Sequence, residues 1–267
     1  MTDRPTGRVA LVTGGSSGIG FAAAAALLEQ GLSVMICGLD ADDVAEATRR
    51  LVAGGQPVAG LAADVTDEAQ VAELVASTVA AFGGVDVLVT AAGVQRYGSA
   101  AETTTQLWDL VMDVNVKGTF LAVRHVIPEL RRRGGGAIVI VSSVQAFTTQ
   151  TSVAAYTASK AALNALARSV AVDEALNGIR ANAVCPASVD TPMLRAAARE
   201  FSDGTPAGEQ QLIDSWGRMH PLGRVARAGE VADVIAYLAS DRASFVTGIS
   251  MPVDGGLLAT AAVVLPE

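Results

Sequence analysis

The residues best suited to chemistry lie in Tyr156-Thr157-Ala158-Ser159-Lys160, where a phenol and an ammonium stand four positions apart. The flanking alanines and leucines are typical of a helix, so the two side chains share one face, with Cβ atoms roughly 5–6 Å apart. An ammonium beside a phenol stabilises the phenolate and lowers the tyrosine pKa from its reference value of about 10. We therefore expect a proton-transfer group that works near neutral pH. A tyrosine and a lysine that merely share a helix surface have the same spacing, so this interpretation depends on the remaining motifs.

A glycine-rich turn near the start of the chain is a candidate cofactor site. An apolar strand at 8–13 runs into Gly14-Gly15-Ser16-Ser17-Gly18-Ile19-Gly20, and a helix at 21–30 follows. Without Cβ atoms, Gly14, Gly18 and Gly20 let the backbone turn sharply and approach a pyrophosphate, while the helix N-terminus supplies N–H donors. The spacing is neither G-x-G-x-x-G nor the G-K-[ST] of a triphosphate site. A tight turn without a ligand is the alternative, and the position after the first strand favours a dinucleotide.

The elements that must position these residues alternate between strand and helix. We predict strands at 8–13, 33–37, 57–61, 85–89, 137–141, 179–184 and 248–253, with helices at 21–30, 42–52, 66–82, 106–133, 153–176 and 230–238. We expect Pro128 to bend the long fourth helix. Residues 192–220 are polar and rich in turn formers, without strand character, and suit a lid over substrate. The pattern predicts an α/β fold, a doubly wound seven-stranded parallel sheet of order 3-2-1-4-5-6-7, with 1–267 as one domain.

Composition and charge argue against several other classes of protein. The 267-residue chain is 51% hydrophobic with a net charge of −8, and it lacks the basic face that nucleic acid requires. The basic triplet 131–133 precedes three glycines and suits the last turn of a helix. We find no secretory signal, no membrane-spanning run and no metal-like cluster around the two histidines. Cys37 and Cys185 lie on strands roughly 19 Å apart in the expected order, too far for a disulfide. We therefore expect a cytoplasmic protein without a metal.

Together these motifs resemble those of the short-chain dehydrogenase/reductase family over about residues 7–256. The matching positions are the T-G-x-x-x-G-x-G turn at 13–20, Asp64-Val65, Asn115, Ser143 (13 residues before the tyrosine), Tyr156-x-x-x-Lys160, the loop 185–193 and Asp254-Gly255-Gly256. The family's N-N-A-G reads Thr90-Ala91-Ala92-Gly93 here, so two bracing amides are missing; Thr90 could replace one hydrogen bond and Ala91 cannot.

The resemblance implies a hydride-transfer enzyme with four catalytic residues. Tyr156 would exchange a proton with the substrate oxygen, and Lys160 would lower the tyrosine pKa and bond the nicotinamide ribose. Ser143 would hydrogen-bond the substrate oxygen, and Asn115 would hold a water linking Lys160 to solvent. A strand-end hydroxyl and a helix amide bonded to backbone are the plain alternatives for Ser143 and Asn115.

The resemblance also implies the cofactor and its contacts, with NAD preferred over NADP. The expected contacts are Gly14, Ser17, Gly18, Ile19, Gly20, Leu39, Asp40, Asp64, Val65, Ala91, Gly93, Tyr156, Lys160, Val189 and Thr191. NADP enzymes often carry arginine where Leu39 stands, and NAD enzymes often carry aspartate where Gly38 stands. Asp40 would repel a 2′-phosphate, although it also suits the N-cap of the second helix.

The substrate is expected to be a secondary alcohol or its ketone, such as a sugar or cyclic polyol. Gln95, Gln145 and Gln150 offer polar contacts beside Ser143 and Tyr156. The alternatives are an NADPH-dependent carbonyl or 3-oxoacyl-thioester reductase, and a non-catalytic dinucleotide-sensing protein. The resemblance and the long helices predict a homo-oligomer, usually a tetramer, and the apolar tail 257–267 suits an interface.

Overall fold

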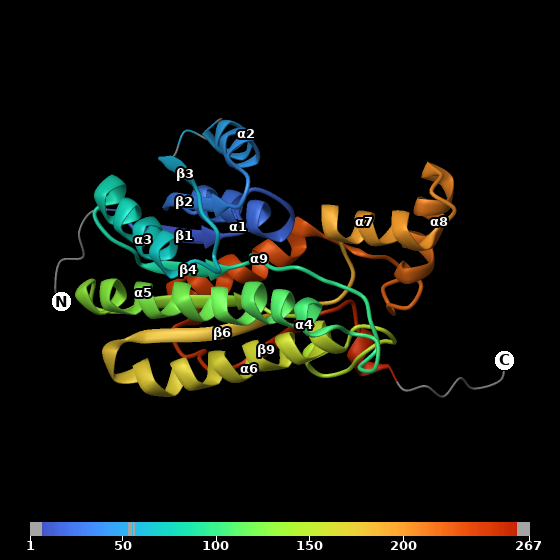
Figure 1. Cartoon of the computed structure of the whole chain (residues 1–267). Helices are drawn as coiled ribbons and strands as arrows, with labels where there is room; N and C mark the ends of the chain where they lie inside the picture. Colours follow the sequence, from blue (N-terminus) through green and yellow to red (C-terminus); the bar gives the residue numbers. More distant parts are fainter. Residues whose placement is uncertain (1–6, 53–54, 56, 261–267) are drawn as a thin grey trace.

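The computed structural model describes residues 7–52, 55 and 57–260, and their central feature is a parallel seven-stranded sheet (Figure 1). Its order is β3-β2-β1-β4-β5-β6-β9. Because β9 is the seventh predicted strand, at 248–253, the predicted order is confirmed. The strands are β1 (Val9–Thr13), β2 (Ser33–Gly38), β3 (Val58–Ala62), β4 (Val87–Thr90), β5 (Gly136–Val141), β6 (Ile179–Pro186) and β9 (Ser250–Val253). A further pair, β7 (Val189–Asp190) and β8 (Ala226–Arg227), lies outside this sheet and was not predicted.

Helices cover both faces of the sheet, which explains why its strands are mostly apolar on both sides. One face packs against α1 (Gly18–Glu29), α2 (Ala41–Val52) and α9 (Ala228–Ala239). The other packs against α3 (Glu68–Phe82), α5 (Gly118–Arg132) and α6 (Ala154–Glu174). Along β5, Ile138 and Ile140 enter the second core while Val139 enters the first, as the alternation of a strand requires.

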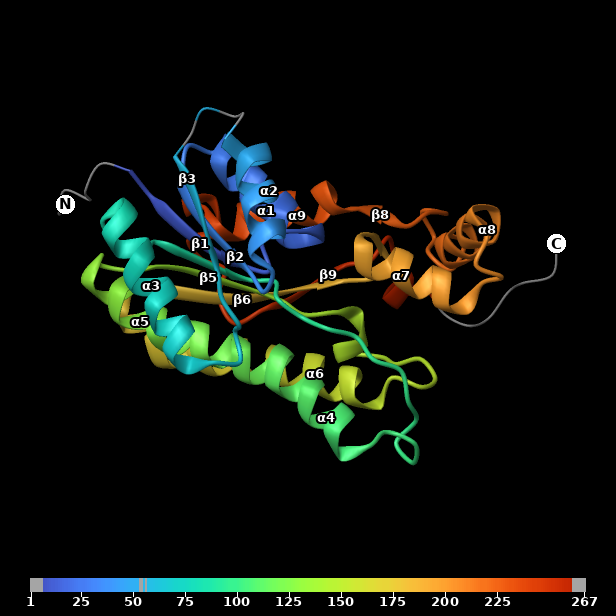
Figure 2. The same ribbon diagram turned by 45° about the horizontal axis from the view of Figure 1, so that its top comes forward.

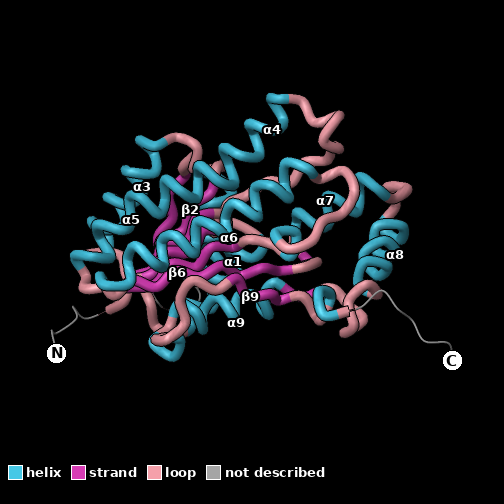
Figure 3. Tube along the Cα trace, turned by 90° about the horizontal axis from the view of Figure 1, so that it is seen from below, coloured by secondary structure: helices cyan, strands magenta, loops and turns pink. Residues whose placement is uncertain are grey.

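The predicted helix 106–133 is divided by a wider turn. Helix α4 (Thr105–Met112) passes into a π-helical turn, Asp113–Lys117, before α5 continues to Arg132. We expected the irregularity at Pro128, but the departure from α geometry lies at the turn containing Asn115, and Pro128 is inside α5. Such turns open a helix locally and are frequent at functional sites. In Figure 3, α4 and α5 run beside α6 across one face of the sheet.

The segment 192–220 is helical rather than loose. Helix α7 (Pro192–Phe201) and helix α8 (Pro206–Gly217) stand beyond one end of the sheet (Figure 2). Each begins with a threonine cap followed by proline: Thr191 accepts from the Leu194 N–H at 3.3 Å, and Thr205 accepts from the Gly208 N–H at 3.0 Å. The threonine–proline pairs are recognisable start signals in the sequence, and the polar composition of the segment obscured them.

A buried ion pair ties the end of α5 to the start of the sheet. Arg133 donates to both carboxylate oxygens of Asp86 at 3.0 and 2.7 Å, and Asp86 also accepts from the Val9 N–H at 2.8 Å. Arginines 131 and 132 form the last turn of α5, as predicted, and Arg133 is its C-cap. Cys37 and Cys185 are buried free thiols, so the absence of a bridge between them is confirmed. Among the described residues, no helix is long and apolar enough to cross a membrane.

Candidate active site

Tyr156 and Lys160 occupy the first turns of α6, and both are buried. The Lys160 ammonium lies 5.3 Å from the centroid of the Tyr156 ring, so the two side chains share one face as predicted. Its Nζ donates a hydrogen bond to the main-chain oxygen of Val141, at the end of β5, at 3.0 Å. This bond fixes the lysine between helix and strand.

The expected lowering of the Tyr156 pKa is wrong for the chain alone. Burial raises the Tyr156 pKa to about 12, outweighing a hydrogen bond with Ser143 that lowers it. Burial also lowers the Lys160 pKa to about 8. Desolvation disfavours the charged form of each group, which moves the two pKa values in opposite directions. At neutral pH the phenol is therefore a proton donor.

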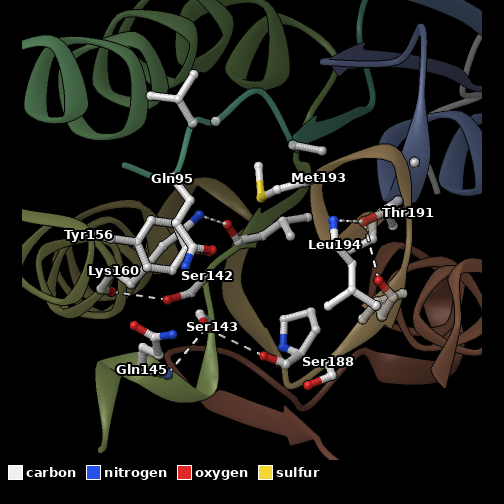
Figure 4. A pocket seen from close by; sticks show the side chains of 18 of the residues that line it. Gln95, Ser142, Ser143, Gln145, Tyr156, Lys160, Ser188, Thr191, Met193 and Leu194 are labelled. Atoms are coloured by element: carbon white, nitrogen blue, oxygen red, sulfur yellow. Dashed lines mark hydrogen bonds between the residues drawn. The ribbon is translucent and has the colours of Figure 1, made fainter. Parts of the chain in front are cut away.

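Ser143 approaches the same space from the sheet. It follows β5, and its Oγ accepts from the Gln145 N–H at 3.1 Å and donates to the Pro186 carbonyl at 3.5 Å. Figure 4 shows Tyr156 and Ser143 facing one cavity, with Leu194 across from them. Ser143 thus caps a turn, which was the non-catalytic interpretation of this residue, and it also faces the Tyr156 phenol.

Asn115 lies in the π-helical turn and is fully buried. Its Oδ1 accepts from the Val94 N–H at 2.8 Å, and its Nδ2 donates to the Val94 carbonyl and to Ser159 Oγ, both at 3.0 Å. Its side chain therefore braces the loop after β4. Both amide hydrogens are used in these bonds, and the water that links Lys160 to solvent stays a prediction.

The cavity at the ends of the strands has a volume of about 920 Å³. It begins at the glycine turn, where Gly14 has φ +66° and an added Cβ would lie 2.5 Å from the Ala92 nitrogen. A Cβ at Gly20 would collide with the Gly14 carbonyl oxygen. The turn is thus packed so closely that only glycine fits, and its helix N-terminus borders open space. Such a crevice at the carboxyl ends of parallel strands, beside the point where strand order reverses between β1 and β4, suits a dinucleotide.

Most of the predicted cofactor contacts lie together around this cavity. The lining includes Gly14, Ser17, Gly18, Ile19, Gly20, Leu39, Asp64, Val65, Ala91, Gly93, Tyr156, Lys160, Val189 and Thr191. Asp40 does not line it; its Oδ1 accepts from the N–H groups of Asp42 and Asp43 at 2.9 and 3.0 Å, as a helix cap. Thr90 does not replace a lost amide bond either, because its buried Oγ1 has no hydrogen-bond partner in the described chain.

The predicted substrate residues Gln95, Gln145 and Gln150 also line the cavity. Arg96 and Phe147, which stand beside them in the sequence, do not. Tyr97, Trp216 and His220, which the sequence also offers as pocket candidates, line the cavity as well. The structure adds residues that sequence reasoning did not single out: Leu194, Ala197, Phe201, Met219, Leu257, Leu258 and Thr260. Most of them come from the segment 192–220 and from residues 257–260, whose arrangement depends on tertiary packing. Val263, Val264 and Leu265 of the expected tail interface lie outside the described residues.

The described part of the chain contains no group of three or more histidine, cysteine, aspartate or glutamate side chains that could hold a metal ion. The side chains that meet at the cavity are able to exchange a proton, through the Tyr156 phenol beside the Ser143 hydroxyl, next to a crevice shaped for a dinucleotide.

Comparison with known proteins agrees with this arrangement. A family model described as "Enoyl-(Acyl carrier protein) reductase" matches residues 14–258. The cis-4-hydroxycyclohexanecarboxylate dehydrogenase of Sinomonas cyclohexanicum is 41% identical over 255 residues, 94% of this chain and 97% of that protein. The NADP-dependent (R)-specific alcohol dehydrogenase of Lentilactobacillus kefiri is 36% identical over 262 residues, 97% of this chain and 100% of that protein.

A solved structure is similar in three dimensions. The ligand-free aldohexose dehydrogenase of Thermoplasma acidophilum superposes with a TM-score of 0.89 at 35% identity, covering 98% of both chains. Its likeness extends over the sheet, the covering helices and the segment that contains α7 and α8. With the buried Tyr156–Lys160 pair, Ser143 and the glycine turn all at one cavity, the chain belongs to the short-chain dehydrogenase/reductase family, as an NAD(P)-dependent oxidoreductase that interconverts a secondary alcohol and a ketone.

Proposed function

We propose that this enzyme uses NAD to interconvert an uncharged secondary alcohol and its ketone, and that the substrate is a sugar or a cyclic polyol. The observation that carries the proposal is the meeting of Tyr156 and Ser143, from different elements, at a cavity continuous with the glycine turn. A bound nicotinamide cofactor supplies or accepts the hydride. The Ser143 hydroxyl holds the substrate oxygen beside the Tyr156 phenol, which donates a proton to it in reduction and accepts one in oxidation.

Lys160 supports this proton transfer. Below its pKa of about 8 it is charged, and its ammonium beside the ring favours the phenolate as the proton leaves. Asn115 acts as a positioning residue, because its side chain holds the loop after β4 rather than the reacting atoms. Val189 and Thr191, on the loop after β6, border the crevice opposite the glycine turn, and Thr191 also caps α7.

The preference for NAD rests on charge near the end of β2. Ser16, Ser17, Gly38 and Leu39 line the cavity there, and Lys160 is the one lysine or arginine in its described lining. A 2′-phosphate needs a cationic partner, and none lies at this end. The negative charge of Asp40 beside Leu39 opposes NADP further. The relative from L. kefiri is named NADP-dependent, so the choice varies among related enzymes.

The substrate class rests on the other end of the cavity. Met193, Leu194, Phe201 and Trp216 form apolar walls, and Gln95, Gln145 and Gln150 add uncharged polar groups. A carboxylate placed there would lose its hydration without a cationic partner beyond the buried Lys160. The relative from S. cyclohexanicum is named for a hydroxy acid with a cyclohexane ring, and the structural neighbour is named for an aldohexose, which is a sugar.

Activity assays test the proposal directly. Purified enzyme is mixed with NAD or NADP and cyclohexanol, cyclohexanediols, sugar alcohols and the matching ketones, and absorbance of the reduced cofactor is followed. We expect turnover with NAD and at least one cyclic alcohol. A tenfold preference for NADP would refute the cofactor assignment, and acetoacetyl thioester reduction as the best reaction would favour the reductase alternative. Nucleotide binding without any turnover would favour the sensing protein.

We also propose that the enzyme is a cytoplasmic homotetramer. Trp108, Leu110 and Phe120 on α4 and α5, and Val172 on α6, are large apolar side chains exposed on neighbouring helices. Large apolar side chains exposed on neighbouring helices favour association between copies of a chain. Light scattering tests the assembly, and a monomer at micromolar concentration would contradict it. The buried free thiols suit a reducing compartment, which cell fractionation tests.

A further inference from the structure

The loop after β4 is held at both ends although it has no regular secondary structure. At one end, Asn115 binds the N–H and the carbonyl of Val94. At the other, Gly98 donates to the Ser152 carbonyl at 2.7 Å and accepts from the Ala154 N–H at 3.3 Å. Ala154 begins α6, two residues before Tyr156. Side chains between Val94 and Gly98 are therefore positioned relative to the reacting phenol.

The side chains of this loop alternate between the cavity and solvent. Gln95 and Tyr97 line the cavity, while Arg96 between them is exposed. Figure 4 shows the Gln95 side chain extending toward Tyr156. The Tyr97 ring meets Phe201, at the end of α7, edge to face, with centroids 4.6 Å apart at 89°. Aromatic pairs favour this arrangement, which fixes the direction of the phenol.

The Tyr97 hydroxyl is a donor without a partner. It makes no hydrogen bond with any residue that the structure describes. Burial and the nearby Glu200 raise the Tyr97 pKa, so the group stays a protonated phenol. Tyr97 and Tyr156 both line the same cavity. Tyr156 and Ser143 are already assigned to the reacting oxygen, so a donor at Tyr97 suits a different atom of the substrate.

We propose that Tyr97 is a specificity-determining residue that donates a hydrogen bond to a second, uncharged oxygen of the substrate, on a carbon other than the reacting one. The substrate class is then cyclic diols, hydroxyketones and diketones. The inference rests on the proposed function and narrows it. The second oxygen is uncharged because Glu200 stands close to Tyr97 and, in the described lining, the one cation is the buried Lys160.

The test compares substrates with one and two oxygens. Values of kcat/KM are measured with NAD for cyclohexanol and for 1,2-, 1,3- and 1,4-cyclohexanediol, on wild type and on Tyr97→Phe. The readout is the ratio of the best diol to cyclohexanol. We expect wild type to favour a diol and Tyr97→Phe to lower the ratio about tenfold, since one hydrogen bond is lost and the ring packing stays. Tyr237→Phe, on α9 away from the cavity lining, is the matched control and leaves the ratio unchanged.

Each outcome of this comparison either supports or overturns the role proposed for Tyr97. A wild-type preference for cyclohexanol over every diol would overturn the inference and leave the proposed function standing. A ratio that shifts less than about threefold in a folded Tyr97→Phe protein would do the same. Absence of turnover on the whole panel, with NAD still binding, would refute the proposed substrate class and this inference together. Folding is checked by the thermal unfolding midpoint of each variant.

Discussion

The side-chain amide of Asn115 holds both main-chain polar groups of Val94, accepting from the N–H at 2.8 Å and donating to the carbonyl at 3.0 Å. The Asn115 amide thereby supplies the pair of hydrogen bonds that a neighbouring strand would give to a residue in a sheet. The contact joins a helical turn and a loop of the same connection, between β4 and β5, and the candidate substrate residues follow directly from the held residue.

We predict that Asn115→Ala lowers both stability and activity. The substitution leaves the Val94 groups and Ser159 without their partner, which costs about 1–3 kcal/mol for buried polar groups. We expect kcat/KM to fall about tenfold or more because Gln95 and Tyr97 lose their fixed position. Urea unfolding and steady-state kinetics measure the two effects. Ser159→Ala, which removes only one of the three bonds, should cost less stability, and wild-type values for Asn115→Ala would contradict the positioning role.

Tyr156→Phe should abolish turnover and leave the cofactor site intact. Loss of the proton-transfer group should reduce kcat by about 10²–10⁴. Because the phenyl ring still fills the buried position, NAD affinity measured by calorimetry should stay within about twofold. A variant that turns over at the wild-type rate would refute the assignment, and one that loses NAD binding would show that the hydroxyl has a structural role.

The two reaction directions should respond oppositely to pH. Burial raises the Tyr156 pKa to about 12, so the protonated phenol, which ketone reduction uses, persists through neutral pH. Alcohol oxidation needs the deprotonated form, whose population rises with pH. We expect kcat/KM for oxidation to rise from about pH 6 to about pH 9 while that for reduction stays flat or falls. Oxidation that is fastest at acid pH would contradict Tyr156 as the base.

Cofactor choice should change by substitution at Leu39 rather than at Gly38. Leu39 is 77% exposed at the cavity, so Leu39→Arg places a cation there without collision and should raise kcat/KM with NADP about tenfold or more. A Cβ at Gly38 would lie 2.6 Å from Ser16 Oγ and 3.1 Å from Val44 Cγ2. Gly38→Asp should therefore lower the thermal midpoint. Equal NADP activity in Leu39→Arg and wild type would contradict the charge argument.

The buried pair of Arg133 and Asp86 should matter far more to stability than exposed pairs. Both side chains are 4% exposed, so Arg133→Ala leaves an uncompensated carboxylate in the interior, at a cost of about 3–5 kcal/mol. Arg49→Ala breaks a pair whose side chains are 74% and 52% exposed and should cost less than about 1 kcal/mol. Chemical denaturation compares the two, and similar losses would show that burial does not decide the difference.

The order of the main sheet and the meeting of the candidate catalytic residues at one cavity were predictable from the chain alone. Apolar runs alternating with helical segments specify a doubly wound sheet, because right-handed crossovers leave few topologies. The glycine turn, Ser143, Tyr156 and Lys160 were recognisable because local spacing places each at a strand end or on a helix face. The threonine–proline starts of α7 and α8 were present in the sequence too, and their polar composition concealed them.

Only the tertiary structure determined the pKa values of buried groups and the contacts between residues that are distant in the sequence. Spacing predicted a lowered tyrosine pKa, but desolvation, which no local pattern reports, raises it to about 12. Asn115 braces Val94, 21 residues away, and Tyr97 meets Phe201, more than 100 residues away, only because the chain returns to the same end of the sheet. The spacing of Tyr156 and Lys160 thus predicts a proton-transfer pair, and the folded chain sets their pKa values and the groups that face them.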